Sequence, residues 1–390
     1  MKKTVGIGVL ILMVLTCTGQ QKSKQEVLRI GIFSSLYLDS AFIQKTYRFD
    51  QKIPSFLQKG LDFALGAQLA VDSLKIKKGT NLLFTLYDIR SKQQRLPQLQ
   101  KKNIFDSLNL ILTDLSGSDF KQLAEIACAR KIPFISVVYP NDAGIRNCPS
   151  MFLLSPTLEV HIEKIYQQLR ETEPLSNIIY VTKKGGLEAR IKNVFDKSNQ
   201  TKEKSRFLKW KVCNASDTLN AETLLPFLDS TAQNILLVGS LDEKFAARIM
   251  ETILPLSVYD IHLYGMPSWH SLPELRSSKY ADLPVYYTSA FFKESDSILP
   301  SFEQKYFEKS NSRPSEISYK AFEATYLFSS ILMEKGPDVL RFIREPKYRV
   351  LTPFKFKPVY HEGSIPSYQE NKFVYILKRE KGILTKLNED

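Results

Sequence analysis

Residues 110–145, with the sequence LILTDLSGSDFKQLAEIACARKIPFISVVYPNDAGI, decide the fold. The run from Leu108 to Thr113 is apolar and too short for a helix, and the run from Ile132 to Val138 is apolar again. The segment between these runs repeats apolar residues at helical spacing, namely Phe120, Leu123, Ala124 and Ala127. The pattern predicts a βαβ unit, with two parallel strands joined by a right-handed crossover.

A small polar loop, residues 114–119, joins the first strand of this unit to its helix. Ser116 with Asp119 resembles a capping box, and the free N–H groups of the first helical turn form a cradle for an anion. Ligands of open α/β sheets bind outside the carboxyl ends of the strands, where residues 116–118 and 139–145 are expected. A solvated helix cap is the other interpretation of this loop, and it stays open at this point.

The same alternation of strands and helices continues along the chain and restarts after Pro149. Residues 40–55 form an irregular insertion, and residues 354–360 and 372–378 alternate like the two strands of a hairpin. The other expected strands are 28–33, 82–87, 151–154, 177–181, 207–212, 235–238, 261–264 and 285–289. The other expected helices are 56–74, 92–102, 158–169, 188–195, 220–228, 243–254, 298–310 and 316–333.

The first residues carry an export signal. A charged start, Met1 to Lys3, precedes the apolar run Val5 to Leu15, which is too short to span a membrane. The next residues, Val-Leu-Thr-Cys, resemble a bacterial lipobox, although Thr16 departs from the usual small residue. We expect residues 1–17 to be a lipoprotein signal, Cys17 to be the acylated N-terminus of a periplasmic protein, and residues 18–26 to be a tether. Plain secretion is the alternative.

Composition and cysteine usage exclude several functional classes. The net charge of +13 is scattered along the chain and follows an export signal, so nucleic acid is not an expected partner. Cys128, Cys148 and Cys213 remain after Cys17, which allows one disulfide; Cys128 and Cys148 flank one strand, but Cys128 also suits a helix core. No metal spacing, nucleophile elbow or phosphate loop occurs, so we expect no enzyme, metal or cofactor.

The order of these motifs resembles the type 1 periplasmic binding protein family, in its branched-chain amino acid receptor group. More narrowly, the chain resembles amino-acid ABC transporter substrate-binding lipoproteins of the Bacteroidetes phylum. The segments that carry the resemblance are LRIGIF, KGLDFALGAQLAVDSL, LLFTLYDIRS, LILTDLSGS, KIPFISVVYPND, IIYVTKKGG, ILLVGSLDE, HLYGMPSW and SYKAFEATYLF.

The resemblance implies an α/β fold with two doubly wound Rossmann-like lobes, joined by a hinge of three crossovers and closing on a small ligand. By analogy, residues 27–154 plus 289–340 form the first lobe, and residues 155–288 plus 341–390 form the second.

The resemblance also implies a ligand site. Family members hold a ligand carboxylate with hydroxyl groups after the third and fourth strands and a ligand ammonium with an acid of the other lobe. The matching positions, with the loop after the first strand added, are Ser34, Ser116, Gly117, Ser118, Tyr139, Asn141 and Asp242. Tyr139 and Asn141 depart from the family pattern, and Lys183 and Lys184 stand where an aromatic residue is expected.

Two functions follow from this reading. The first is a solute-binding lipoprotein that passes an amino acid or similar small polar molecule to the membrane subunits of an ABC transporter. The second is a protein-interaction module of the cell envelope that kept the fold and lost its ligand. The Ser-Gly-Ser loop and Asp242 favour the first function, whereas the changed loops and the basic surface favour the second.

Overall fold

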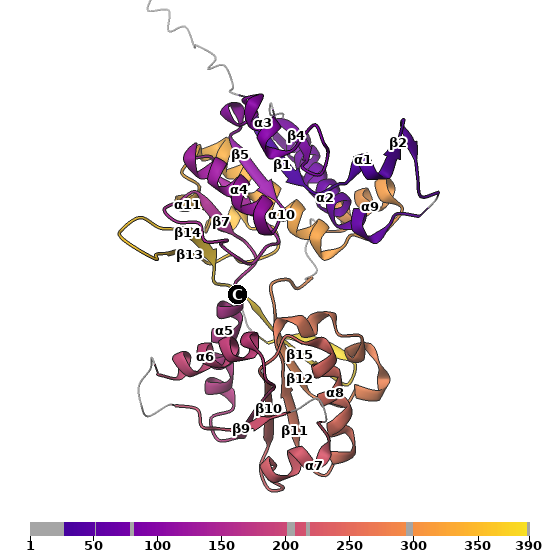
Figure 1. Cartoon of the computed structure of the whole chain (residues 1–390), viewed down its shortest axis with the longest axis vertical. Coiled ribbons are helices and arrows are strands. Elements are labelled where there is room, and N and C mark those ends of the chain that lie inside the picture. The colour runs from indigo at the N-terminus through magenta and orange to yellow at the C-terminus, as the bar shows by residue number, and fades with distance from the viewer. Residues whose placement is uncertain are drawn as a thin grey trace, which may run out of the picture.

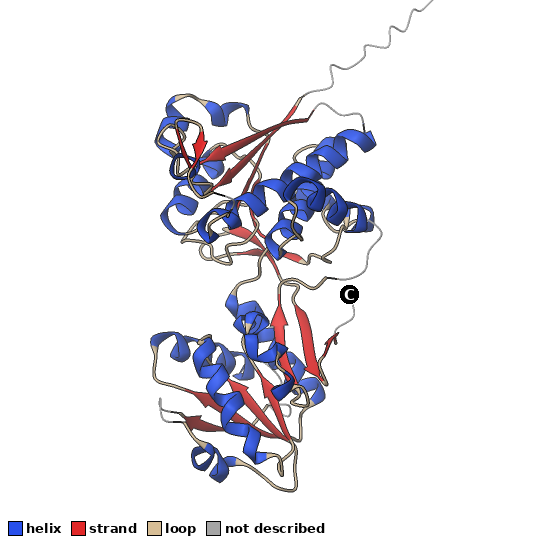
Figure 2. Cartoon of the chain, turned by 90° about the vertical axis from the view of Figure 1, so that its right-hand side faces the viewer, coloured by secondary structure: helices blue, strands red, loops and turns tan. Residues whose placement is uncertain are grey.

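The computed structural model describes residues 27–50, 52–78, 82–200, 207–215, 219–293 and 299–387. The signal, Cys17 and the tether predicted for residues 1–26 therefore lie outside the described residues. The chain forms two α/β lobes, one above the other in Figure 1, and the view in Figure 2 separates the two sheets clearly. The predicted fold class is confirmed.

The first lobe contains a seven-stranded sheet in the order β13-β14-β7-β6-β5-β1-β4. All neighbouring strands are parallel except the β13–β14 pair. The strands are β1 (Leu28–Ser34), β4 (Leu82–Asp88), β5 (Leu110–Thr113), β6 (Phe134–Ser136), β7 (Met151–Leu153), β13 (Phe356–Val359) and β14 (Tyr368–Asn371). The predicted βαβ unit of residues 110–145 is present as β5, α4 (Gly117–Ala129) and β6, with β5 pairing directly with β6.

Helices cover both faces of this sheet. On one face α2 (Ser55–Lys78) and α10 (Glu316–Lys335) pack with each other and with Ile30, Leu112 and Ile135 of the strands. The two helices approach closely at Gly66, where an added Cβ would lie 2.3 Å from the carbonyl oxygen of Ser318. On the other face lie α3 (Leu96–Lys101) and α4, and α9 (Leu299–Ser310) and α11 (Val339–Phe342) complete the lobe.

The second lobe repeats the arrangement around a sheet in the order β16-β15-β12-β11-β10-β8-β9. Its strands are β8 (Asn177–Thr182), β9 (Trp210–Asn214), β10 (Asn234–Val238), β11 (Ile261–Tyr264), β12 (Val285–Ser289), β15 (Tyr375–Glu380) and β16 (Ile383–Lys386). The helices α5 (Leu158–Thr172) and α6 (Gly186–Gln200) cover one face. On the other face lie α7 (Ala221–Leu224), α8 (Glu243–Ile253) and the short 3-10 turns after β11.

The chain passes between the lobes three times, after β7, after β12 and between β14 and β15. Each passage leaves the carboxyl end of its strand, so the carboxyl edges of the two sheets face one another. Asn371 joins the first and third passages, because its Nδ2 donates to the carbonyl oxygens of Leu154 (3.0 Å) and Phe373 (3.3 Å). Thr157 at the first passage donates to Glu370 at the third, at 2.6 Å.

The C-terminal segment differs from the sequence-based expectation. Residues 354–360 do not pair with residues 372–378; β13 pairs with β14 in the first sheet, and β15 pairs with β12 and β16 in the second. Residues 356–371 thus belong to the first lobe's sheet, whereas the whole of 341–390 was expected in the second lobe. The unexpected β15–β16 turn places Lys381 and Gly382 at positive φ, as a two-residue hairpin turn requires.

Smaller differences lie in the first lobe. The predicted irregular insertion contains a short turn of helix, α1 (Leu38–Ala41), and a two-stranded hairpin of β2 (Phe42–Ile43) and β3 (Thr46–Tyr47). The helix expected over residues 92–102 is shorter, because Pro97 fixes its start and it covers only Leu96–Lys101.

The three cysteines after Cys17 adopt one of the arrangements that the sequence left open. Cys128 and Cys148 form a disulfide that links the end of α4 to the loop before β7, and Cys213 is a buried free thiol in β9. Within the described ranges, no helix is both long and apolar enough to cross a membrane, and no cluster of histidine, cysteine or acidic residues has the make-up of a metal site.

Candidate functional site

The first lobe presents the carboxyl ends of its strands to the second lobe, and Asp88 lies at this edge. This buried carboxylate belongs to the last residue of β4 and accepts hydrogen bonds from the backbone N–H groups of Leu36, Tyr37 and Leu38, at 2.8–3.2 Å. Asp88 therefore fixes the loop that follows β1.

Ser34 and Asp114 form the centre of this edge. They end neighbouring strands, since β1 and β5 pair up to Phe33 and Thr113. Ser34 Oγ donates to Asp114 Oδ2 at 3.0 Å, while Oδ1 of Asp114 is buried and has no hydrogen-bond partner. Burial raises the pKa of the Asp114 carboxyl to about 7, although the Ser34 hydroxyl acts in the opposite direction. Ser34 is thus already bonded to an acid, which the sequence reasoning did not select.

The loop after β5 is exposed at the start of α4. Ser116 occupies the N-cap position, but its side chain makes no capping hydrogen bond, and Gly117 has φ of 63° with open space around it. Asp119 forms an ion pair with Arg90 at 3.0 Å instead of completing the predicted capping box. The capping-box prediction was therefore wrong. Ser116, Gly117 and Ser118 are exposed at the carboxyl edge of the first sheet.

Tyr139 and Asn141, after β6, have mainly local contacts. The ring of Tyr139 packs against Phe120 of α4 with centroids 5.0 Å apart, and its carbonyl oxygen accepts a hydrogen bond from Ser136. Asn141 Oδ1 accepts from the backbone N–H of Ala143 at 2.7 Å, which closes a turn. Asn141 itself is exposed and Tyr139 is half-buried.

The second lobe contributes Asp242 at the N-terminus of α8. Its Oδ1 caps the helix by accepting from the N–H groups of Lys244 (2.9 Å) and Phe245 (3.2 Å), and its Oδ2 forms an ion pair with Lys183 after β8. The Lys183 hydrogen bond is the main reason why the pKa of Asp242 lies below its usual range. Both oxygens of the predicted ammonium acceptor thus have partners within the lobe.

A buried polar cluster lies beside the hinge. Glu323 of α10 accepts hydrogen bonds from the N–H groups of Leu351 and Thr352 and from the Thr352 hydroxyl. Burial raises the pKa of Glu323 to about 7. His161 of α5 contacts Thr288 of β12 at 2.9 Å, and burial lowers its pKa to about 3, so His161 is neutral at pH 7. His161 thus joins α5 to β12, the strand before the second passage, whereas Glu323 fixes the segment that precedes β13 in the first lobe.

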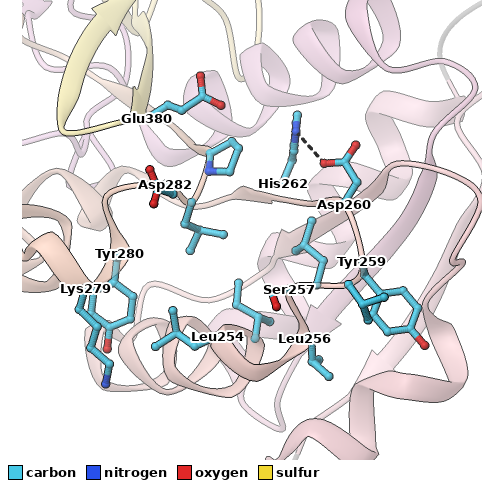
Figure 3. A pocket seen from close by; sticks show the side chains of 15 residues that line it. Leu254, Leu256, Ser257, Tyr259, Asp260, His262, Lys279, Tyr280, Asp282 and Glu380 are labelled. Carbon is cyan, nitrogen blue, oxygen red and sulfur yellow. Dashed lines mark ion pairs between the residues drawn. The ribbon is translucent and has the colours of Figure 1, made fainter.

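A separate pocket of about 700 Å³ lies at the outer end of the second lobe, shown in Figure 3. It is formed where β11 and β12 begin, which is the amino edge of the second sheet and faces away from the first lobe. Its wall combines apolar side chains such as Leu254 with Asp260, Asp282 and Glu380, and Nε2 of His262 lies 3.4 Å from Oδ1 of Asp260. Since parallel sheets bind ligands at the carboxyl edge, this pocket is distinct from the candidate site.

Solved structures resemble this arrangement over almost its whole length. A protein from Rhodospirillum rubrum, named provisionally as a branched-chain amino acid ABC transporter, matches with a TM-score of 0.67 and 12% identity, covering 93% of this chain and all of that chain. The chain has the fold of the type 1 periplasmic binding proteins. No protein-family model matches the sequence, and no curated protein matches it either.

Two further structures with this type 1 fold contain amino acids. An ABC transporter substrate-binding protein from Desulfitobacterium hafniense, in complex with Leu, has a TM-score of 0.54 and 14% identity. The branched-chain amino acid transporter substrate-binding protein LivJ from Streptococcus pneumoniae, in complex with isoleucine, has a TM-score of 0.51 and 13% identity. Each alignment covers 93% of this chain and 100% of the other.

Sequence reasoning missed Asp88 and Asp114 as organising residues of the first lobe's edge. Asp88 is the last residue of β4 and Asp114 directly follows the buried strand β5, and an acid at a strand's carboxyl end was the available signal. Lys183 was noticed as a departure from the family pattern, but its pairing with Asp242 depends on the adjacency of β8 and β10, which only the structure gives.

Proposed function

We propose that this chain is a solute-binding protein that captures a small polar ligand, an amino acid, between its two lobes for an ABC-type transporter. The observation that carries the proposal is that the carboxyl edges of two mainly parallel sheets face one another across a three-passage hinge. Hinged lobes of this kind close around ligands. The leucine and isoleucine in the two structures above support an amino acid as the ligand class.

The proposed location is the periplasm, with Cys17 acylated and residues 18–26 serving as a tether. The lipobox-like sequence and the apolar run before it support this part of the proposal. The membrane subunits of an ABC transporter are the proposed partner, nucleic acid is not, and no catalytic activity is proposed.

The proposed ligand site combines the exposed Ser116–Ser118 loop with Ser34, Tyr139 and Asn141 of the first lobe and with Asp242 of the second. Exposed hydroxyls beside the N–H groups at the start of α4 suit a ligand carboxylate. A ligand ammonium that uses Asp242 must compete with Lys183, which already pairs with that carboxylate.

The second candidate function is an envelope protein-interaction module with no ligand. The Lys183–Asp242 pair favours it, because the acid that would bind an ammonium is satisfied without a ligand.

Ligand-dependent thermal unfolding tests these two functions against each other. The chain from residue 18 onward, refolded to remove endogenous ligand, is heated with amino acids, short peptides and cell-wall fragments. A ligand at 100 times its dissociation constant adds about 2.7 kcal/mol to the free energy of unfolding. Under our proposal one class shifts the melting temperature, and Ser118→Ala or Asp242→Ala removes that shift, whereas Ser257→Ala at the far end of the second lobe does not. The absence of a shift with every compound supports the interaction module.

A further inference from the structure

The first lobe carries an exposed apolar face on the segment that follows β1. This segment, residues 37–56, contains α1, the β2–β3 hairpin and the start of α2, and β2 projects from the side of the lobe (Figure 1). Soluble proteins usually scatter their exposed apolar side chains, whereas a contiguous set of them marks an interaction surface. We call this set the hairpin face, and its large apolar side chains, which are 40–56% exposed, are Leu38, Phe42, Ile43, Ile53 and Phe56.

Ring contacts make the hairpin face continuous. Phe42 and Tyr47, on the two strands of the hairpin, have ring centroids 5.5 Å apart, and Tyr47 and Phe49 have theirs 5.8 Å apart. Phe49 lies 5.9 Å from Phe56 at the start of α2, and Phe56 lies 5.5 Å from Tyr37. These rings therefore form one row that runs from the hairpin to the loop after β1.

The segment is held in a fixed conformation. The Tyr47 hydroxyl donates to the carbonyl oxygen of Lys52 at 2.8 Å, and Arg48 donates to a carbonyl oxygen of α1 at 3.1 Å. The turn residues Gln44 and Lys45 have φ of 45° and 72°, which costs energy for residues with a side chain. Such strain persists only where the surrounding structure enforces it, and it gathers at functional sites. The exposed side chains are therefore presented in place.

Basic side chains are interspersed with the apolar ones. Lys45, Arg48 and Lys52 are exposed on the hairpin and directly after it. Lys59, in the first turns of α2, is exposed as well. Residues 37–59 contain four basic and two acidic residues, which gives a net charge of +2. The three lysines form no ion pair with any other described residue, so their charges are available to a partner.

This mixture of side chains favours a membrane over a protein as the partner. The centres of protein–protein interfaces are enriched in aromatic residues and arginine but depleted in lysine. A membrane surface accepts aromatic rings at the level of the lipid headgroups, while lysine stems extend and place their ammonium groups on anionic headgroups. The hairpin face, with aromatic rings, isoleucines and unpaired lysines, has the second composition.

The position of the first lobe fits the same partner. The described chain begins at Val27 and enters β1 at once, so it enters through the lobe that carries the hairpin face. Under the proposed acylation of Cys17, residues 18–27 separate the lipid from β1, and a chain of that length spans at most about 36 Å. The hairpin face is therefore on the lobe that the anchor keeps within reach of the membrane.

We propose that the hairpin face binds the surface of a membrane that contains anionic lipids, with Ile43 and Ile53 entering the interface beside the row of rings and the lysines contacting the headgroups. This contact is peripheral and reversible, because it buries far less apolar surface than a spanning helix. It acts as a second contact beside the lipid anchor. The inference does not depend on a solute ligand, and only its argument from reach rests on the proposed acylation.

Vesicle sedimentation tests the proposal with the chain from residue 18, which carries no lipid. Vesicles of phosphatidylcholine alone are compared with vesicles of equal parts of phosphatidylcholine and phosphatidylglycerol. The expected result is binding to the mixed vesicles that weakens as salt is added, because salt screens the attraction between lysines and headgroups. Binding to phosphatidylcholine alone should be weaker.

The apolar contribution is tested by Ile43→Ser combined with Ile53→Ser, which leaves the row of rings intact. This variant should bind the mixed vesicles about tenfold more weakly or less, because two apolar side chains no longer leave water on binding. Its melting temperature should stay unchanged, since both side chains are exposed. The matched control, Leu175→Ser combined with Ile383→Ser, removes two exposed apolar side chains of the second lobe and should bind like the wild type.

The charge contribution is tested by Lys45→Gln combined with Lys52→Gln. Binding to the mixed vesicles should weaken by roughly fivefold per lysine, the effect of one basic residue close to an anionic surface. The control, Lys209→Gln combined with Lys244→Gln, removes two exposed lysines of the second lobe and lowers the net charge equally. It should bind nearly as well as the wild type, which separates the hairpin face from the general positive charge of the chain.

A tryptophan in place of Ile43 reports whether the hairpin tip enters the membrane. The natural tryptophans, Trp210 and Trp269, lie in the second lobe. The emission of Ile43→Trp should move to shorter wavelength on mixed vesicles and should be quenched by brominated acyl chains, whereas the wild-type emission should not change.

Three outcomes overturn the inference. One is the absence of binding to either kind of vesicle. Another is an equal loss of binding in the hairpin variants and their controls, which means attraction by net charge alone. The last is self-association that Ile43→Ser with Ile53→Ser abolishes while no vesicle binds, which assigns the face to a second copy of the chain. None of these outcomes affects the solute-binding function, because the thermal-unfolding test of that function contains no vesicles.

Discussion

Reduction of the disulfide between Cys128 and Cys148 should destabilise the first lobe by about 3 kcal/mol. The two residues are 20 positions apart, and in the chain-entropy model closing a loop of that length removes roughly 11 cal/mol/K from the unfolded state, or about 3 kcal/mol at 25 °C. The reduced wild-type protein is the cleanest comparison, because it keeps every core atom, whereas a double alanine variant also loses packing around Cys148.

The positions of other residues make the assay specific to one lobe. Both tryptophans, Trp210 and Trp269, lie in the second lobe, so their fluorescence follows that lobe, while far-UV circular dichroism follows both. Oxidised and reduced protein are unfolded in guanidinium and compared. Reduction should move the circular dichroism transition of the first lobe to lower guanidinium concentration. If the two lobes unfold separately, the fluorescence transition should move less.

Thiol titration checks the assignment directly. Without Cys17, three of the four cysteines remain, and the disulfide leaves only Cys213 as a thiol. The oxidised chain should show no rapidly reactive thiol when folded, because Cys213 is buried and burial raises its pKa, one when unfolded, and three after reduction. Three thiols in the oxidised unfolded chain, or a loss of less than about 1 kcal/mol on reduction, would refute the reasoning.

Three further predictions concern single side chains. Gly66→Ala should destabilise the first lobe by roughly 1–3 kcal/mol in denaturant unfolding, because the new methyl group meets the backbone of α10. Gly186→Ala is the control, because its methyl group enters open space and should not destabilise the protein. Equal effects of the two variants would contradict this reasoning. Asp242→Ala should lower the free energy of unfolding by about 1 kcal/mol, because the cap of α8 is lost, and Asp242→Asn should lower it less. Equal melting temperatures of the two variants would count against the role of Asp242 as a helix cap. Glu323 has its pKa raised from 4.5 to about 7, so the folded state holds the extra proton and the free energy of unfolding falls as pH rises through that window. Glu323→Gln should make unfolding at pH 5 and pH 8 more alike, and an unchanged pH dependence would exclude this role.

The regular part of the fold could be predicted because its signals are local. The apolar runs of β1 and β5 and the helical spacing of α4 each appear within a dozen residues, and their alternation indicates parallel sheets. The predicted pairing of the C-terminal strands was wrong because strand partners are not a local signal. Residues 372–378 have a strand pattern, but nothing local says that their partner is β12, nearly 90 residues earlier.

The position of the candidate site could be predicted from the sequence, but the hydrogen-bond and ion-pair partners of its residues could not. The loops at Ser116 and Asp242 were expected at the strand ends, and both begin helices there. Their partners were not predictable, because the Ser34–Asp114 and Lys183–Asp242 contacts join segments about 80 and 59 residues apart. The disulfide between Cys128 and Cys148 could not be predicted for the same reason, because it depends on how the end of a helix packs against a loop.

The interleaving of the C-terminal segment has a consequence for how the chain folds during synthesis. The first sheet is incomplete until β13 and β14 emerge, and the second lacks β15, which lies between β12 and β16. Neither lobe can finish its sheet until nearly the whole chain has left the ribosome, whereas a protein with sequential domains folds its first domain early. Neither lobe is therefore complete until synthesis is almost over, and a chain without complete lobes is easier to thread through a narrow channel than a finished fold.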